Sequence, residues 1–326
     1  MLLREEPYAV LGPAPRSIGV VWDLKNASTH PPTAYLLVAP AAWMPWPMSS
    51  VVWAWLMIAA LLASFHATGY SWKTSSLLTS LAILWPPTSH SLFQITIVWL
   101  LGAMLAFQFR SSKPMLSGMF IGIASFTKFL PVIMLIPFII RRNWRALWGF
   151  LWSWLVAIAT ILAIAPNTFA RYLEVNRITS IETFLREDNS SPLALLFKNR
   201  LGPFEIAGAV LLFAVLVIAM IRLSRSRVRR ENISFAEWSF YSYLCVRLLP
   251  ILWIYSIVPL LPVLIRVTEK GGVPGVLAAG AIVLAFFALP FSLGTTLFLI
   301  PLLLISGSAI VASAMPQLAG AGPKAG

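Results

Sequence analysis

Charged residues are scarce in this chain of 326 residues: they make up 11% of it, whereas 59% of the residues are hydrophobic. Soluble domains carry roughly a quarter charged residues, and a soluble core of this length would not use so much apolar surface. A lipid bilayer is therefore the expected solvent for most of the chain. A single cysteine, Cys245, excludes a disulfide within the chain.

Acidic residues are also few, 11 against 24 lysines and arginines, which gives a net charge of +13. The arginines cluster in short loops between apolar runs, so the excess indicates cytoplasmic loops of a membrane protein rather than nucleic-acid binding. Residues 1–9 are polar, and no cleavable signal peptide is expected. Glu237 is the one carboxylate clearly inside an apolar run, so the acidic relay expected of many ion or solute transporters is missing.

The apolar runs predict an all-α, polytopic integral membrane protein with about eleven crossings, some of them shorter than the roughly 20 residues that a membrane-spanning helix needs. The runs are 49–66, 74–87, 94–110, 115–127, 129–140, 145–164, 206–222, 234–249, 251–266, 272–290 and 291–313. The predicted parts are an N-terminal segment 1–48, a transmembrane module 49–164, a loop 165–205, C-terminal helices 206–313 and a flexible tail 314–326. Within the first part, the proline-interrupted residues 31–48 predict a short helix on the outer membrane surface.

Basic residues set the expected orientation. They gather around 141–145, 222–230 and 266–270, and the predicted crossings place these three loops on one side, the cytoplasmic one. Residues 1–48 and 165–205 are then extracytoplasmic. We expect a multi-pass protein of the plasma (inner) membrane whose active face lies outside the cytoplasm.

Lys128 is the one charged residue between Gly118 and Ile140. A charge in such an apolar run usually faces protein, water or a ligand rather than lipid. Basic residues flank the run on both sides, so a cytoplasmic location of both flanks requires the chain to reverse near Lys128 and Pro131. This reversal would place one positive charge at the far membrane face, where it would hold an anionic lipid headgroup.

Five segments, in this order, resemble the polyprenyl-phosphate-sugar-dependent glycosyltransferases of family 87, which are multi-pass enzymes of the GT-C class. Residues 30–56 resemble the aromatic-Pro-Pro motif and its following helix, and residues 91–110 resemble the Gly-Gln segment. Residues 117–147 resemble the block with a glycine-spaced helix, a Lys near Pro, and Arg-Arg-x-Trp-Arg. Residues 187–200 look like the Asn-x-Ser loop, and residues 249–262 look like the Ser-Pro-x-x-Trp segment.

The chain departs from the family pattern at single positions. Phe93 stands in place of a usual glycine and Leu249 in place of the serine. Ile254 and Tyr255 occupy the positions of the acidic and His partners. The resemblance still implies a GT-C-type helical bundle.

The family usually begins with a transmembrane helix and an extracytoplasmic Asp, roughly twenty residues before a Pro-Tyr or Leu-Tyr pair. Here Pro7-Tyr8 stands close to Met1, so this helix and this Asp have no counterpart. The expectation is either a truncated sequence or a member that has lost the usual base.

The resemblance implies a transferase that moves a monosaccharide, mannose by family analogy, from a polyprenyl-phosphate donor to a glycolipid or cell-envelope glycan. Attack on the anomeric carbon would be direct and inverting, and a carboxylate would take the proton of the attacking hydroxyl. Asp23, Glu6 with its neighbour Glu5, and Asp188 are the local substitutes for the missing Asp. The alternative for each, and the one we favour, is a solvated loop carboxylate, or for Asp188 a helix-capping or loop role.

Cations stabilise the charge that grows on a leaving phosphate. Lys128 and Arg247 are the candidate phosphate contacts, with snorkelling or a structural ion pair as the alternatives. The candidate substrate-binding residues are His30, Gln94, Asn189 and Tyr255. For His30 and Gln94 the commoner alternative is a polar residue satisfied at a helix end. The three histidines lack metal-ligand spacing. GT-C enzymes can use a divalent cation, and nothing in this sequence requires one.

A second hypothesis is a non-catalytic relative that binds or moves a lipid-linked sugar. The missing first helix and Asp favour it. The expected partners under either hypothesis are the polyprenyl-phosphate sugar and membrane lipids, with a glycolipid or glycan acceptor for the enzyme.

Overall fold

The structure is a computed structural model. It describes residues 31–42, 44–45, 48–92, 95–170, 172–173, 233, 235–247, 258–262, 264–265 and 269. The chain forms two compact units, and the first, which holds the described helices from Pro32 to Arg247, comprises Met1–Ala194 and Ser226–Pro259. Its described ranges contain helices and no strand, which agrees with the expected all-α class.

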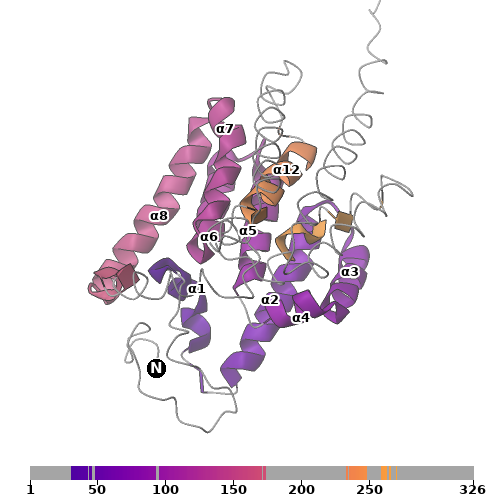
Figure 1. Cartoon of the computed structure of the whole chain (residues 1–326), viewed down its shortest axis with the longest axis horizontal. Coiled ribbons are helices and arrows are strands. Elements are labelled where there is room, and N and C mark those ends of the chain that lie inside the picture. The colour runs from indigo at the N-terminus through magenta and orange to yellow at the C-terminus, as the bar shows by residue number, and fades with distance from the viewer. Residues whose placement is uncertain are drawn as a thin grey trace, which may run out of the picture. The chain divides into compact units, whose positions relative to one another are not determined.

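The helices follow the apolar runs closely (Figure 1). Their bounds are α1 Pro32–Ala42, α2 Met48–Ala67, α3 Trp72–Leu84, α4 Pro86–Ser91, α5 Thr96–Phe109, α6 Pro114–Thr127, the 3-10 helix η3 Leu130–Leu135, α7 Ile136–Ile140, α8 Trp144–Ile164 and α12 Phe235–Arg247. In the part of the chain that the structure describes, α2 and α8, with 20 and 21 residues, are long and apolar enough to cross a membrane by length and composition. The count of about eleven crossings stays a prediction.

One sequence prediction differs from the structure in detail. The run 74–87 is not one helix, because α3 ends at Leu84 and Trp85 is extended before the Pro-Pro pair that starts α4. A residue before proline avoids the helical region, which explains this boundary. The short helix predicted within residues 31–48 is α1, which packs against α2, α6 and α8 with its first turn buried around Thr33; its location at the membrane surface stays a prediction.

Helices α6 and α8 pack against each other along their length because both carry small residues at the contact. A Cβ atom on Gly118 would overlap the carbonyl oxygen of Ala146, and one on Gly149 would overlap that of Met115. Further along, a Cβ atom on Gly122 would overlap the hydroxyl of Ser153. The contacts advance in the same direction on both helices, so α6 and α8 run parallel, side by side (Figure 1).

Parallel neighbours require the connecting chain to return along the bundle. Helix α6 has 14 residues, which corresponds to about 21 Å at 1.5 Å per residue. The return consists of η3 and α7, with 6 and 5 residues, and covers a similar length because a 3-10 helix rises about 2.0 Å per residue. The predicted reversal at Lys128 is therefore confirmed, although the returning arm is a 3-10 helix followed by one α-helical turn rather than a single helix over 129–140.

The return ends in a Schellman motif, a hydrogen-bonded helix C-terminus. The amide of Asn143 donates to the carbonyl of Phe138 at 2.9 Å, and the amide of Arg142 donates to that of Ile139 at 2.9 Å. Arg142 has a φ of 52°, the left-handed conformation that this motif needs. The chain can thus leave α7 and enter α8 across three residues, Arg141, Arg142 and Asn143.

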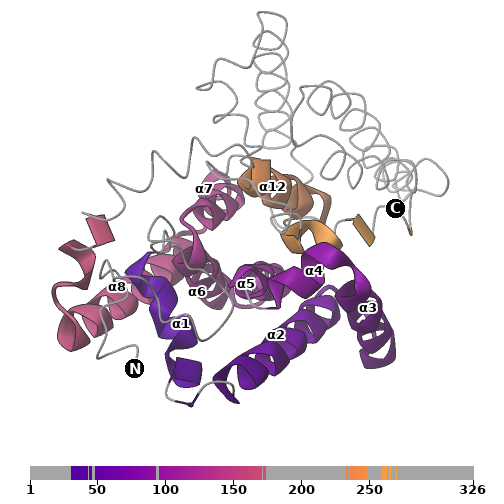
Figure 2. The same cartoon turned by 60° about the horizontal axis from the view of Figure 1, so that its bottom comes forward.

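Helix α12 packs on η3 and α5 (Figure 2). Its first turn lies near the end of the return, since Trp238 stacks edge-on against Phe138 at 6.3 Å between ring centroids. Its last turn lies near the start of the return, since the thiol of Cys245 donates to the carbonyl of Leu130 at 3.3 Å. Helix α12 is therefore antiparallel to the returning arm and connects the two ends of the hairpin.

Candidate active site at the reversal of the chain

Lys128 lies at the break between α6 and η3. It is the C-cap of α6 and has extended backbone angles, φ −156° and ψ 141°. The break has a local cause, because Pro131, in the first turn of η3, has no amide hydrogen with which to continue α6. The half-buried lysine thus sits at the carbonyl end of α6, where the helix dipole favours a cation.

Hydroxyl groups bind backbone carbonyls in the last turns of α6, including that of Ala124, one of the four at the end of the helix that lack a partner within it. The side chain of Thr127 donates to the carbonyl of Ala124 at 2.8 Å, and that of Ser125 donates to Gly122 at 2.6 Å. These bonds hold the residues around Lys128 without any charged group.

Aromatic residues form one wall of this end of the bundle. The indole of Trp154 on α8 donates to the hydroxyl of Ser125 at 2.7 Å. Its ring lies edge-on to Phe126 and stacks on Phe129, with centroids 5.3 Å apart in both pairs. Phe129 itself is exposed. Lys128 is therefore flanked in sequence by apolar groups that restrict water on the side of α8.

The first turn of α1 reaches the same place from far away in the sequence. The hydroxyl of Thr33 donates to the carbonyl of Phe126 at 3.4 Å, and both residues are buried. Pro31 and Pro32, which start this turn, are also buried. The structure thus brings the Pro-Pro segment and the Lys128 block together, as the predicted outer face requires.

The end of α12 contributes a third segment. Cys245 contacts the carbonyl of Leu130, two residues after Lys128, and α12 ends at Arg247. The backbone therefore carries Arg247 to the lysine end of the hairpin, the end at which the sequence predicted it.

The remaining sequence-predicted site residues lie outside the described part of the chain. They are Glu5, Glu6, Asp23, His30, Gln94, Asp188, Asn189 and Tyr255. Their proposed roles stay predictions. In the described part of the first unit, the carboxylates reduce to Glu237, and it lies at the opposite end of the hairpin. Groups of three or more metal-ligating side chains are absent from the described residues.

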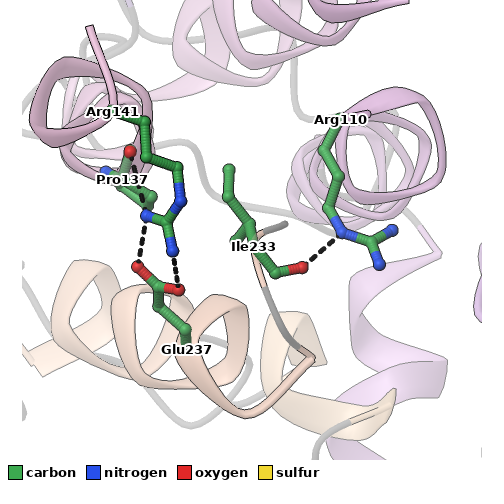
Figure 3. Close-up of polar contacts among 5 residues, drawn as sticks. All are labelled: Arg110, Pro137, Arg141, Ile233 and Glu237. Carbon is green, nitrogen blue, oxygen red and sulfur yellow. Dashed lines mark hydrogen bonds and ion pairs between the residues drawn. The ribbon is translucent and has the colours of Figure 1, made fainter. Parts of the chain in front are cut away.

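Sequence reasoning missed a polar cluster at this opposite end. Arg141, at the C-cap of α7, forms a bidentate ion pair with Glu237 at 2.8 and 2.7 Å (Figure 3). Both side chains are buried, with exposed fractions of 9% and 1%. The sequence analysis placed Arg141 in a loop and Glu237 within a membrane span, and it named no partner for Glu237. The location of a carboxylate inside an apolar run was the available signal, because such a charge is normally paired.

Arg110, at the C-cap of α5, makes a second contact at this end. Its guanidinium donates to the backbone carbonyl of Ile233 (Figure 3) and to that of Phe107, the latter at 2.7 Å. It also lies 3.7 Å from the centroid of the Phe107 ring. Cations therefore lie at both ends of the hairpin: Lys128 at one end, and Arg110 and Arg141 at the other.

The converging segments belong to a single family pattern. Residues 29–250 match the family model of Glycosyltransferase family 87, which is more than half of the chain. The chain belongs to glycosyltransferase family 87. The matched range includes α1, the Lys128 hairpin and α12, so the segments that meet at the chain reversal all lie within the family match.

A curated relative agrees with this assignment. The chain is 28% identical over 226 residues to the polyprenol-phosphate-mannose-dependent alpha-(1-2)-phosphatidylinositol mannoside mannosyltransferase of Mycobacterium tuberculosis (strain ATCC 25618 / H37Rv). The aligned part is 61% of this chain and 53% of the relative, so the chain spans about half the length of that protein. No solved structure matches the chain.

Proposed function

We propose that the chain is a membrane glycosyltransferase that moves mannose from a polyprenyl-phosphate donor to a lipid or glycan acceptor on the extracytoplasmic side. Membership of family 87 supports sugar transfer. The mycobacterial relative, a polyprenol-phosphate-mannose-dependent mannosyltransferase, supports the choice of donor. The divided arrangement of cations at the two ends of the hairpin supports the choice of face.

The observation that carries the proposal is the convergence of α1, α6 and α12 on the break at Lys128. Three segments far apart in sequence meet there, through Thr33, Phe126, Leu130 and Cys245. Structural packing alone does not require a lysine at such a meeting point, because a charge near apolar surroundings is costly. A lysine placed there fits a role toward an anionic ligand.

In the proposed reaction, an acceptor hydroxyl oxygen attacks the anomeric carbon of the donor sugar. A new C–O bond forms, the C–O bond to the phosphate breaks, and polyprenyl phosphate leaves with the bonding electron pair. The hydroxyl proton passes to a carboxylate acting as general base. Asp23, Glu6 and Asp188 remain the proposed candidates for this base.

Lys128 and Arg247 would bind the donor phosphate. A fixed ammonium group stabilises the negative charge that grows on the leaving oxygen, and it does so more strongly where the surroundings exclude water. The aromatic wall formed by Phe126, Phe129 and Trp154 would provide such surroundings and would also contact the polyprenyl chain.

Orientation follows from the same geometry. Lys113, Arg142 and Arg145 are exposed at the end opposite Lys128. Exposed basic residues in short loops favour the cytoplasmic side, so the lysine end would face away from the cytoplasm. The mannose acceptor and the donor headgroup would meet on that side.

A transfer assay in membranes tests the proposal. Membranes from cells that express the full-length protein receive radiolabelled polyprenyl-phosphate mannose, and label is followed into lipid and glycan fractions. We expect Lys128→Ala to abolish most transfer and Lys128→Arg to retain part of it, since arginine keeps the charge. Lys73→Ala is the matched control, because Lys73 is an exposed lysine on α3 and its loss should leave transfer unchanged.

Three outcomes would contradict the proposal. Undiminished transfer in Lys128→Ala would remove the lysine from the reaction. Binding of the donor without transfer, in the wild-type protein, would favour a non-catalytic binder of a lipid-linked sugar. Labelling of a cysteine at position 128 by a membrane-impermeant reagent from the cytoplasmic side would place the site on the wrong face.

A further inference from the structure

Helix α12 is held at its first turn by two arginines, each from the C-terminal end of another helix. Arg141, at the end of α7, binds the carboxylate of Glu237 in the first turn of α12. Arg110, at the end of α5, binds the carbonyl of Ile233, just before α12. We define Arg110, Arg141 and Glu237 as the arginine clamp, which Figure 3 shows.

Both arginines of the clamp lie at the C-terminal ends of helices, which fixes the direction from which each one reaches α12. Arg141 also donates to the carbonyl of Pro137 at 3.1 Å, and Arg110 also donates to that of Phe107 at 2.7 Å. Each guanidinium therefore joins the negative end of its own helix to the first turn of α12, where a carboxylate is favourable. A bidentate arginine–carboxylate pair fixes orientation as well as distance.

Apolar contacts alone fix α12 less closely at this point. Phe107 lies edge-on to Phe235 and tilted toward Trp238, at 5.3 and 5.9 Å between centroids. Such ring contacts tolerate sliding, whereas the ion pair accepts one position of Glu237. A buried charge pair is weak as a source of net stability compared with apolar packing, but it can select one arrangement among several.

The position selected at the clamp determines what happens at the other end of α12. Cys245 lies eight residues after Glu237, which is about 12 Å along a helix. There its thiol reaches the carbonyl of Leu130, directly after the Lys128 break. A rigid helix transmits a shift of its first turn to its last turn, so a displacement at the clamp would also displace the backbone of Arg247 at the end of α12.

We propose that Arg141 and Glu237 are positioning residues that set the register of α12 along the hairpin, so that Arg247 and Lys128 together form the phosphate-binding pair. The role in phosphate binding rests on the proposed function, whereas the effect on the register of α12 does not. Arg110 stabilises the same position of α12 by its hydrogen bond to the backbone carbonyl of Ile233, just before the helix.

The single cysteine provides a direct measurement of this register. Cys245 is buried against Leu130, and it is the one cysteine of the chain. We expect a small maleimide to label it slowly in the wild-type protein in detergent or nanodiscs. Glu237→Gln keeps the shape of the side chain but removes its charge. Labelling of Cys245 should become faster by about tenfold or more. A tenfold change corresponds to a loss of about 1.4 kcal/mol in the free energy that keeps the thiol buried.

The exchanged variant Arg141→Glu/Glu237→Arg separates register from general loss of folding. Restored pairing should return labelling of Cys245 toward the wild-type rate, whereas either single substitution should not. Arg145→Gln is the matched control, because Arg145 is an exposed arginine of the neighbouring turn. Labelling in Glu237→Gln at the wild-type rate, in protein that elutes as one species, would overturn the proposal.

Transfer kinetics then test the connection to the phosphate site. We expect Glu237→Gln and Arg247→Gln each to raise the KM for the polyprenyl-phosphate sugar more than they lower kcat. Because both substitutions act through one contact, transfer by the double variant should be no lower than transfer by the more impaired of the two single variants. Fully additive effects would overturn the connection to Arg247. A protein without any transfer activity that still shows the expected Cys245 labelling would refute the proposed function and leave the register effect supported.

Discussion

At one end of the α6–η3–α7 hairpin, Arg141 is paired with Glu237 inside the protein, and at the other end Lys128 lies at the chain break. The two ends are about 20 Å apart along α6. Both carry cations in apolar surroundings, but their neighbours differ. The arginine end uses a carboxylate and backbone carbonyls from three helices. The lysine end is assembled from hydroxyl groups, aromatic rings and a thiol.

The difference separates two uses of buried charge. Where a cation is met by a carboxylate with two short hydrogen bonds, its charge is neutralised within the fold and contributes to one arrangement of helices. At the other end, the phosphate-binding role proposed for Lys128 would direct its charge toward a ligand on which negative charge develops during the reaction. The following variants test this contrast.

The largest effect on stability is expected from Glu237→Ala. Removing one partner of a buried ion pair leaves a charge without compensation and costs about 3–5 kcal/mol. Thermal unfolding in detergent micelles should show a clear decrease of Tm. Arg145→Gln, at an exposed position, should change stability by less than about 0.5 kcal/mol. Equal Tm values for the two variants would erase the contrast between the ends.

The largest effect on transfer is expected from Lys128→Ala. Loss of one group that stabilises transition-state charge typically lowers the rate by about 10² to 10³-fold. The same variant should lose less stability than Glu237→Ala, because Lys128 is only half-buried. Measuring initial transfer rates and Tm on the same preparations gives both values. A loss of Tm as large as that of Glu237→Ala would make Lys128 a structural residue like the arginines.

Gly118→Val tests the packing of α6 against α8 between the two ends of the hairpin. Its side chain would overlap the carbonyl oxygen of Ala146, and overpacking of this kind typically costs about 1–3 kcal/mol. Separation of α6 from α8 should also weaken the Trp154–Ser125 contact, so transfer should decrease together with stability. Leu151→Ala on the exposed face of α8 is the control and should leave both nearly unchanged, in unfolding and transfer measurements.

The smallest effect is expected from Arg142→Gly at the end of α7. A non-glycine residue in the left-handed region costs about 1–2 kcal/mol, and Arg142 has a φ of 52°. Glycine removes this strain but loses more backbone entropy on folding. The net result should be a stability within about 1 kcal/mol of the wild type, with unchanged transfer. A large loss in Tm would show that the side chain of Arg142 belongs to the clamp after all.

Several elements could be predicted because their cause is local. The bounds of α2, α5, α6 and α8 match the apolar runs to within about two residues, as helix ends usually do. The break at Lys128 follows from Pro131 and the flanking basic residues, and the chain reversal follows from the break. The site residue that the structure describes fully, Lys128, was accessible to sequence reasoning for the same reason.

Contacts between helices could not be predicted, because the sequence does not show which residues of separate runs meet. The Arg141–Glu237 pair joins residues of two separate runs, and the burial of Thr33 depends on the end of α6. Periodicity reports which residues are apolar, but not which helix each one contacts. The contacts of the 31–48 segment could not be predicted, because its prolines and aromatic residues suit the membrane interface and a buried helix start equally well.

The amino-acid sequence by itself determined that this chain is helical, where most of its described helices begin and end, and that it reverses at Lys128. These properties arise from backbone hydrogen bonding within short segments, which an apolar solvent enforces locally. Tertiary structure alone decided which segments meet at each end of the hairpin, because close approach depends on the fit of small residues, hydroxyl groups and charges from distant runs. The ion pair at one end and the assembled lysine site at the other are consequences of that fit.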